Sequence, residues 1–117
     1  MSGSTSYHAG LAAEDSVARE YRAAGSDILA SRWRGQGGEI DLICRDGDEI
    51  VFCEVKKSSS WDRAAEALGP RQIARMFQAA AEYVARFPTG ADTPMRFDLA
   101  VVDSAGRIDL REGAIFV

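Results

Sequence analysis

The sequence predicts a single α/β domain, more closely an α+β arrangement, in which a mixed β-sheet is flanked by helices. Two observations predict it. Hydrophobic periodicity gives the order helix, three strands, helix, then further strands, which favours a mixed sheet covered by helices. The chain has 117 residues, 46% of them hydrophobic and 27% charged, which suits one compact core. We therefore expect residues 10–117 to form the domain and residues 1–9, rich in Ser and Gly, to form a flexible tail.

The first elements follow from apolar spacing and from glycines. Apolar residues recur at helical intervals over 11–24, and Gly25 is a natural helix stop. "DILASRW" reads as a short strand, and the three glycines of "RGQGG" allow a turn or a flexible loop. Residues 39–45 and 49–56 read as two strands joined through "DGD", a strong hairpin signal.

The second half begins with a polar connection over 58–69. Pro70 suits the first turn of a helix, and an apolar stripe then runs to about residue 86. "FPTGADTP" is a predicted loop, "MRFDLAVVD" an apolar strand and "SAGR" a turn, with short terminal strands expected at "IDL" and "AIFV".

Composition excludes several classes of protein. A net charge of −4 and a pI near 4.9 argue against nucleic-acid binding over the whole surface, but they leave room for a local basic groove. No apolar run approaches a membrane span and the first residues do not resemble a signal peptide, so we expect a cytoplasmic protein with no membrane partner. Cys44 and Cys53 lack metal-ligand spacing and are predicted to be buried thiols.

The predicted hairpin carries charges where a core would be apolar. Because side chains alternate along a strand, Ile40, Leu42 and Cys44 should share one wholly apolar face. Asp41 and Glu54 should meet on the other face if the connecting loop has two or four residues, either directly opposed or diagonal.

Two carboxylates held close together repel each other, so keeping both ionised requires a cation. Lys56, two residues from Glu54 and on its face, supplies one charge, and Mg²⁺ or Mn²⁺ would supply the rest. Glu14 lies on the inward stripe of the first predicted helix and is a candidate third carboxylate. The alternative is that Asp41, Glu54 and Lys56 form a solvated ion-pair ladder on an exposed sheet edge.

Four stretches together resemble the YraN family, small bacterial proteins related to Holliday-junction resolvases. They are "GLAAEDSVAREYRAAGSDILASRWR", "GGEIDLICRDGDEIVFCEVKK", "RQIARMFQAAAEYV" and "RFDLAVV", in the family's order and covering nearly the whole chain from about Gly10. The wider group is the restriction-endonuclease-like superfamily with its PD-(D/E)XK signature. The resemblance implies a restriction-endonuclease-like core, a central mixed sheet with helices on both sides.

The resemblance also implies roles for site residues. Asp41 of "GEID", Glu54 and the backbone carbonyl of Val55 would hold Mg²⁺ or Mn²⁺, which would polarise a phosphodiester and activate water. Lys56 would position that water or stabilise charge on the phosphate. By the same resemblance Glu14 matches an auxiliary metal ligand, and Gln72 matches a supporting residue of the following helix.

The chain departs from the family at one basic position. Where relatives usually carry an arginine shortly after the lysine, as in "EVKTR", this chain has Lys57 and Ser58, so the bidentate grip of arginine on phosphate is lost. The candidate nucleic-acid contacts are then Arg34, Lys57, Trp61, Arg71 and Arg75, with Trp61 able to stack on a base. Asp98 of "RFD" is expected to pair with a neighbouring arginine in a structural role.

Three functions fit these residues. The first is a Mg²⁺- or Mn²⁺-dependent endonuclease acting on DNA, branched or single-stranded. The second is a nucleic-acid-binding module that keeps the fold without turnover, and the third is a partner protein of DNA recombination or uptake. Resolvases act as homodimers because a junction has two strands to cut symmetrically, so the resemblance also raises the expectation of a homodimer.

Overall fold

The strands form one mixed five-stranded sheet, as the sequence predicted. The computed structural model describes residues 3–116, with side chains from Gly10 onward. The sheet has the order β1-β2-β3-β4-β5, in which only the β3–β4 pair is parallel. The strands are β1 (Asp27–Arg34), β2 (Glu39–Asp46), β3 (Glu49–Lys57), β4 (Met95–Val102) and β5 (Ile108–Arg111).

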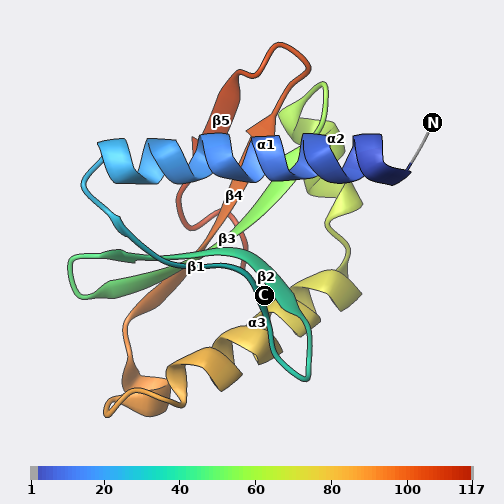
Figure 1. Cartoon of the computed structure of the whole chain (residues 1–117). Coiled ribbons are helices and arrows are strands. Elements are labelled where there is room, and N and C mark those ends of the chain that lie inside the picture. The colour runs from blue at the N-terminus through green and yellow to red at the C-terminus, as the bar shows by residue number, and fades with distance from the viewer. Residues whose placement is uncertain (1–2, 117) are drawn as a thin grey trace.

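Helices cover both faces of this sheet (Figure 1). One face packs against α1 (Gly3–Ala23) and the other against α3 (Pro70–Val84), preceded by the short α2 (Trp61–Ala67). A single 3₁₀ turn, η1 (Gly90–Asp92), leads from α3 towards β4. The parallel β3–β4 pair requires a crossover connection, and α2 and α3 provide it. The fold class is therefore α+β, consistent with a restriction-endonuclease-like core.

The first helix is longer than the sequence suggested. Its buried residues Ala13, Val17 and Tyr21 repeat every four positions, with Ala18 beside Val17 on the same face, and the chain turns out of the helix at Gly25 with φ +95°. The helix begins at Gly3, so residues 3–9, for which a flexible tail was expected, have helical backbone here. The weak apolar periodicity of that segment explains why the earlier start was not predicted.

Two other segments differ from expectation. The connection after β3 was predicted to be polar and irregular, but it contains α2, whose Ser60 side chain accepts the N–H of Arg63 as an N-cap. Of the one or two terminal strands expected over "IDL" and "AIFV", the first is β5, whereas residues 114–116 are irregular and Val117 lies outside the described residues. Ile115 is nonetheless buried, and its N–H donates to the carbonyl of Phe97 at 3.1 Å. The segment therefore packs on the core without forming a strand.

The hairpin loop has two residues, one of the two lengths for which the sequence predicted that Asp41 and Glu54 share a face. Gly47 and Asp48 connect β2 to β3, and Gly47 supplies the positive φ of +61° that such a loop needs. Leu42 pairs with Cys53 in the antiparallel register, so the next position of β2, Asp41, stands opposite Glu54.

The predicted face of Ile40 is wrong. Leu42 and Cys44 pack under α1, but Ile40 packs in the cluster under α3. The alternation breaks at Asp41, and the opposing position on β1 is Arg32, whose φ of +50° is left-handed. A left-handed residue in a strand twists the ladder locally, and the period of two does not survive across it.

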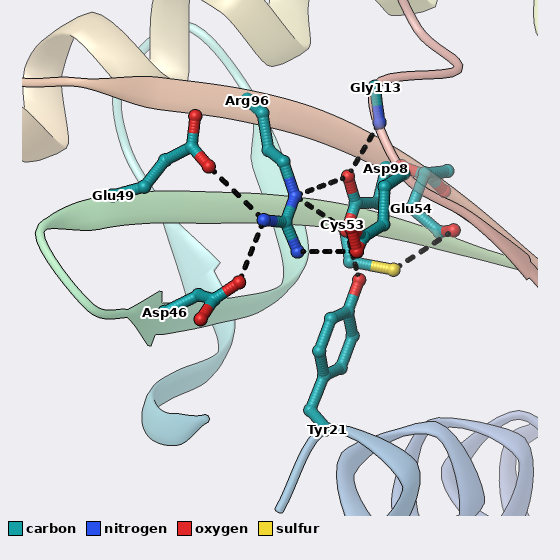
Figure 2. Close-up of polar contacts among 9 residues, drawn as sticks. Tyr21, Asp46, Glu49, Cys53, Glu54, Arg96, Asp98 and Gly113 are labelled. Atoms are coloured by element: carbon teal, nitrogen blue, oxygen red, sulfur yellow. Dashed lines mark hydrogen bonds and ion pairs between the residues drawn. The ribbon is translucent and has the colours of Figure 1, made fainter. Parts of the chain in front are cut away.

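A buried network around Asp98 fastens β4 to the rest of the fold, as Figure 2 shows. Asp98 is 0% exposed and accepts the hydroxyl of Tyr21 at 2.7 Å and the N–H of Gly113 at 2.9 Å. Arg96 reaches from β4 to Asp98 at 3.1 Å and to the carboxylates of Asp46 and Glu49 in the hairpin. The expected structural pairing of Asp98 with an arginine is confirmed.

The remaining expectations concern cysteines and membranes. Cys44 and Cys53 are both buried and carry free thiols, as predicted. Burial raises the pKa of Cys44 to about 12, with the charge of Asp98 as a further cause, so this thiol is unreactive at neutral pH. Within residues 3–116, none of the helices has the length and apolar character to cross a membrane.

Candidate active site

Two carboxylates stand opposite each other where β2 and β3 separate. The β2–β3 ladder ends at the Leu42–Cys53 pair, and beyond it Asp41 turns its carboxylate towards β3. Its Oδ2 accepts the backbone N–H of Val55 at 2.8 Å, in place of a carbonyl of β2. This bond places Asp41 beside Glu54, as the sequence predicted for a two-residue loop.

Glu54 is the most buried acid of this site, with 7% of its surface exposed. Burial, followed by charge repulsion from the neighbouring Asp41, raises the pKa of Glu54 from 4.5 to about 9. The ammonium of Lys56 opposes this shift but does not cancel it. The pair alone therefore holds a proton at neutral pH, and a positive charge placed between the two carboxylates would release it.

Gln72 connects Glu54 to Lys56 from the first turns of α3. Its amide nitrogen donates to Oε1 of Glu54 at 3.2 Å, and its amide oxygen accepts from the ammonium of Lys56 at 3.3 Å. Lys56 itself lies 3.9 Å from Oε1 of Glu54. Because Gln72 donates on one side and accepts on the other, it fixes the positions of both charged groups. The structure thus brings the predicted Gln72 to the predicted pair.

Glu14 reaches the same region from α1, but it is held by an arginine. Its Oε1 accepts from Nε of Arg32 at 2.8 Å, with both side chains partly buried. Burial raises the pKa of Glu14, and the charge of Asp41 adds to the shift, which shows that the two acids are neighbours. No sequence spacing links Glu14 to Arg32, since the contact depends on the left-handed backbone of Arg32 in β1.

The donor set fits a hard divalent cation. Asp41 and Glu54 offer carboxylate oxygens, and Mg²⁺ typically binds through one or two carboxylates with water completing its shell. The N–H of Val55 points at Asp41, and because both backbone groups of a strand residue point the same way, its carbonyl faces that side as well. In the described part of the chain no three His, Cys, Asp or Glu side chains gather into a metal-binding group. A cation here would therefore depend on two carboxylates, the Val55 carbonyl and water.

The loop between β1 and β2 is fastened to α3 by close backbone approach. A Cβ on Gly37 would clash with the side chain of Gln78, and one on Gly38 would lie 2.9 Å from the backbone oxygen of Arg75. Glu82 of α3 accepts the N–H groups of Gln36 and Gly37 at 2.8 and 2.9 Å. The loop, which was predicted to be a turn or a flexible segment, is thus packed against α3. Asp41 follows this loop in β2, so the packing sets its position relative to the helix that carries Gln72.

The expected nucleic-acid contacts fall into two groups. Arg34 is paired with Glu39 at 2.9 Å on the outer strand, and the ring of Trp61 lies 4.0 Å below the guanidinium of Arg111. Lys57, Arg71 and Arg75 are exposed, and no carboxylate within residues 10–116 forms an ion pair with them. The positive charges of the second group are available to a nucleic acid near the start of α3, whereas the residues of the first group already contact other side chains of the protein.

Comparison with known proteins places this chain among close relatives. The sequence model of the uncharacterised protein family UPF0102 matches residues 13–102. The UPF0102 protein of Ruegeria pomeroyi is 54% identical over 96% of this chain and 91% of its own length. A UPF0102 protein of Cereibacter sphaeroides is 52% identical over 97% of both chains, and one from Roseobacter denitrificans is 51% identical over 97% of this chain and 88% of its own length.

Proposed function

Since this chain belongs to the uncharacterised protein family UPF0102, a YraN-like family, we propose from its site that it is a Mg²⁺- or Mn²⁺-dependent endonuclease hydrolysing phosphodiester bonds in DNA. One observation carries the proposal: Asp41 opposes the buried Glu54, whose raised pKa calls for a cation, with Lys56 3.9 Å from Glu54. A structural ion-pair ladder on an exposed edge would leave Glu54 solvated and β3 at the margin of the sheet. Instead Glu54 is buried on the central strand, so the arrangement favours a site over a ladder.

Each residue of the site has a distinct task in this proposal. Asp41, Glu54 and the carbonyl of Val55 would hold Mg²⁺ or Mn²⁺. When bound, such an ion polarises a phosphodiester and lowers the pKa of water. Lys56, oriented by Gln72, donates a hydrogen bond either to the attacking water or to a phosphate oxygen on which charge develops.

Glu14 has a secondary task. Because Arg32 neutralises much of its charge, Glu14 does not add a third full repulsion to Asp41 and Glu54. It can accept a hydrogen bond from water at the site, which agrees with the auxiliary role expected from the family resemblance. We include in the proposal that the active protein is a homodimer, which light scattering after size-exclusion chromatography measures directly.

The test is cleavage of end-labelled DNA in branched, single-stranded and duplex forms, with Mg²⁺ and with Mn²⁺. Wild type is compared with Asp41→Ala, Lys56→Ala and the control Asp48→Ala, which removes an exposed acid in the hairpin loop. Metal-dependent cutting should be lost in the first two variants and kept in the third. If the folded wild type leaves every substrate intact in both metals, the proposal is wrong.

A second candidate function is a nucleic-acid-binding module without turnover. The observation that favours it is the engagement of Glu14 by Arg32, which leaves only two carboxylates facing the cation position. This function predicts salt-dependent DNA binding that survives Asp41→Ala or improves, because the change removes repulsion of phosphate. Binding without cleavage would select it over the nuclease.

A further inference from the structure

A charged groove lies beside the site, between α1 and β1. Its volume is about 280 Å³. Ala18, Ile28 and Leu42, which are buried or half-buried, form its apolar part, while the exposed Arg19 and Arg22 line it from one face of α1. Residues three to four apart on a helix share a face, so α1 presents these two guanidinium groups side by side.

The charge of this groove is opposite to that of the whole chain. Its lining has three cations, Arg19, Arg22 and Arg32, against two carboxylates, Glu14 and Asp15, whereas the chain carries a net charge of −4. Arg32 and Glu14 already pair with each other. No described carboxylate forms an ion pair with either of the other two arginines. Their charge is therefore available to a ligand.

The other arginines of the chain fall into two groups. Arg34, Arg96, Arg107 and Arg111 form ion pairs with neighbouring Asp or Glu side chains, whereas no described carboxylate forms an ion pair with Arg45, Arg63, Arg71, Arg75 or Arg86. Arg19 and Arg22 differ from these unpaired arginines because they lie together along one groove with Arg32, where their adjacent positive charges favour the binding of an external anion. The guanidinium group binds phosphate through paired N–H donors, which makes phosphate the anion of best fit.

The groove is continuous with the candidate active site. Glu14 and Arg32 line it, and so does Leu42, which is the neighbour of Asp41 on β2. At a rise of 1.5 Å per residue, Arg19 and Arg22 lie about 7.5 and 12 Å along α1 from Glu14. One strand of a duplex carries a phosphate every 3.4 Å of axis, so these distances correspond to roughly two to four nucleotides.

We infer that this groove binds the backbone phosphates of a nucleic-acid strand that crosses the Asp41 and Glu54 site, two to four nucleotides from the position of Glu14, with Arg19 and Arg22 as the contacts. The inference rests on the proposed function for the strand that crosses the site, but the binding itself requires no hydrolysis. It assigns α1 to substrate recognition, in addition to its packing against the sheet. Free inorganic phosphate has the same chemistry and is the alternative ligand to be excluded.

The test is fluorescence anisotropy of a labelled single-stranded oligonucleotide titrated with the full chain in EDTA at several salt concentrations. Arg19→Gln/Arg22→Gln is compared with the control Arg45→Gln/Arg63→Gln, which removes the same charge from two exposed arginines that do not line this groove. Loss of two phosphate contacts should reduce the slope of log Kd against log salt by about 1.4. The control should keep the wild-type slope. Equal slopes for the two double variants would overturn the inference.

Two further experiments distinguish failure of the groove assignment from failure of the proposed nuclease function. Inorganic phosphate should displace the oligonucleotide no better than chloride at the same ionic strength, and stronger displacement by phosphate would overturn the assignment to a strand. Cleavage is followed separately with wild type and Mn²⁺. A wild type that cuts nothing but binds with an arginine-dependent slope removes the proposed nuclease and keeps the groove. A wild type that cuts while both double variants bind alike removes the groove and keeps the nuclease.

Discussion

Oδ2 of Asp41 accepts the backbone N–H of Val55 at 2.8 Å, where the β2–β3 ladder has just ended. The carboxylate therefore does two things at once. It satisfies a donor of the central strand, and it brings a negative charge beside the buried Glu54. The two tasks can be separated, because an amide oxygen can accept the same hydrogen bond without carrying charge.

The Asp41→Asn protein should keep the fold but lose its affinity for the divalent cation. Its amide oxygen can accept from Val55, and removal of the charge relieves repulsion of Glu54, so the free energy of unfolding should stay equal or rise. Asp41→Ala leaves the donor unsatisfied and should destabilise by about 1–2 kcal/mol. Urea denaturation measures the free energy of unfolding of both variants, and calorimetry with Mn²⁺ measures their affinity for the cation. An Asp41→Asn protein that binds Mn²⁺ as tightly as wild type would remove Asp41 from the metal site.

Glu54 gives the apoprotein a pH dependence of definite sign. Burial and then the charge of Asp41 raise its pKa from 4.5 to about 9, while Lys56 lowers it and Glu14 raises it. The folded state thus holds a proton that the unfolded state releases, so stability is greatest below pH 4.5 and falls as the pH rises towards about 9. Glu54→Gln should flatten this dependence and stabilise the protein at pH 8 by on the order of 2 kcal/mol.

The measurement is the midpoint of thermal unfolding in EDTA from pH 5 to pH 9. Glu66→Gln, which changes an exposed acid of α2, is the matched control and should track wild type. Added Mn²⁺ should stabilise wild type more at high pH, since binding of the ion displaces the proton of Glu54. A wild-type curve parallel to that of Glu54→Gln would mean that Glu54 ionises without penalty.

Gln72 should affect turnover rather than substrate binding. Gln72→Ala removes the amide that orients both Lys56 and Glu54, and the remaining ammonium and carboxyl groups can be hydrated. We expect kcat for DNA cleavage to fall about tenfold, equivalent to about 1.4 kcal/mol, with KM nearly unchanged. Gln36→Ala, in the exposed β1–β2 loop, serves as control. A rise in KM at constant kcat would instead make Gln72 a DNA contact.

The glycines of the β1–β2 loop set the distance between β2 and α3. A methyl group on Gly38 would lie 2.9 Å from the backbone oxygen of Arg75, which cannot move without shifting α3. Gly38→Ala should therefore destabilise by about 1–3 kcal/mol and lower Mn²⁺ affinity by displacing Asp41. Gly69→Ala, where a Cβ would meet nothing within 4 Å, changes only the N-cap of α3, so it should cost no more than about 1 kcal/mol and leave Mn²⁺ affinity unchanged. Equal effects of the two substitutions would show that the loop adapts.

The hairpin was predictable because its determinants are local. The "DGD" turn marks the hairpin, and for a loop of two or four residues the alternation of side chains places Asp41 and Glu54 on the same face. Helix α2 was also within reach, since Ser60 precedes it as a capping residue, but the serine run and the short length of the segment favoured a loop. The capping serine is a local signal for a helix start, and it is present in the sequence alone.

Other features depend on tertiary structure and leave no local signal. Arg32 adopts φ +50° in β1 and meets Glu14 across 18 positions, and this distortion reverses the face of Ile40. Glu82 binds the N–H groups of a loop 45 and 46 positions away. A residue with left-handed backbone or a distant acceptor is chosen by the packed structure, and single-sequence patterns of period 2 or 3.6 do not encode it.

Asp98 should be the acid whose loss destabilises the protein most. It is fully buried and accepts from Tyr21 of α1, Arg96 of β4 and Gly113 of the C-terminal segment, so Asp98→Ala leaves three donors without their acceptor. Removing one partner of a buried ion pair costs about 3–5 kcal/mol. Asp109→Ala, which breaks an exposed pair with Arg111, should cost less than about 1 kcal/mol.

Urea denaturation of both variants measures this difference, and Asp98→Asn provides an intermediate case that keeps an acceptor oxygen but loses the charge facing Arg96. The order of stability should be wild type and Asp109→Ala, then Asp98→Asn, then Asp98→Ala. An Asp98→Ala protein as stable as Asp109→Ala would contradict the structural role. Tyr21 lies on α1, so loss of this network should also weaken the packing of the helix that carries Glu14. Mn²⁺ affinity of the folded Asp98→Asn protein should therefore fall, although its Asp41–Glu54 pair is intact.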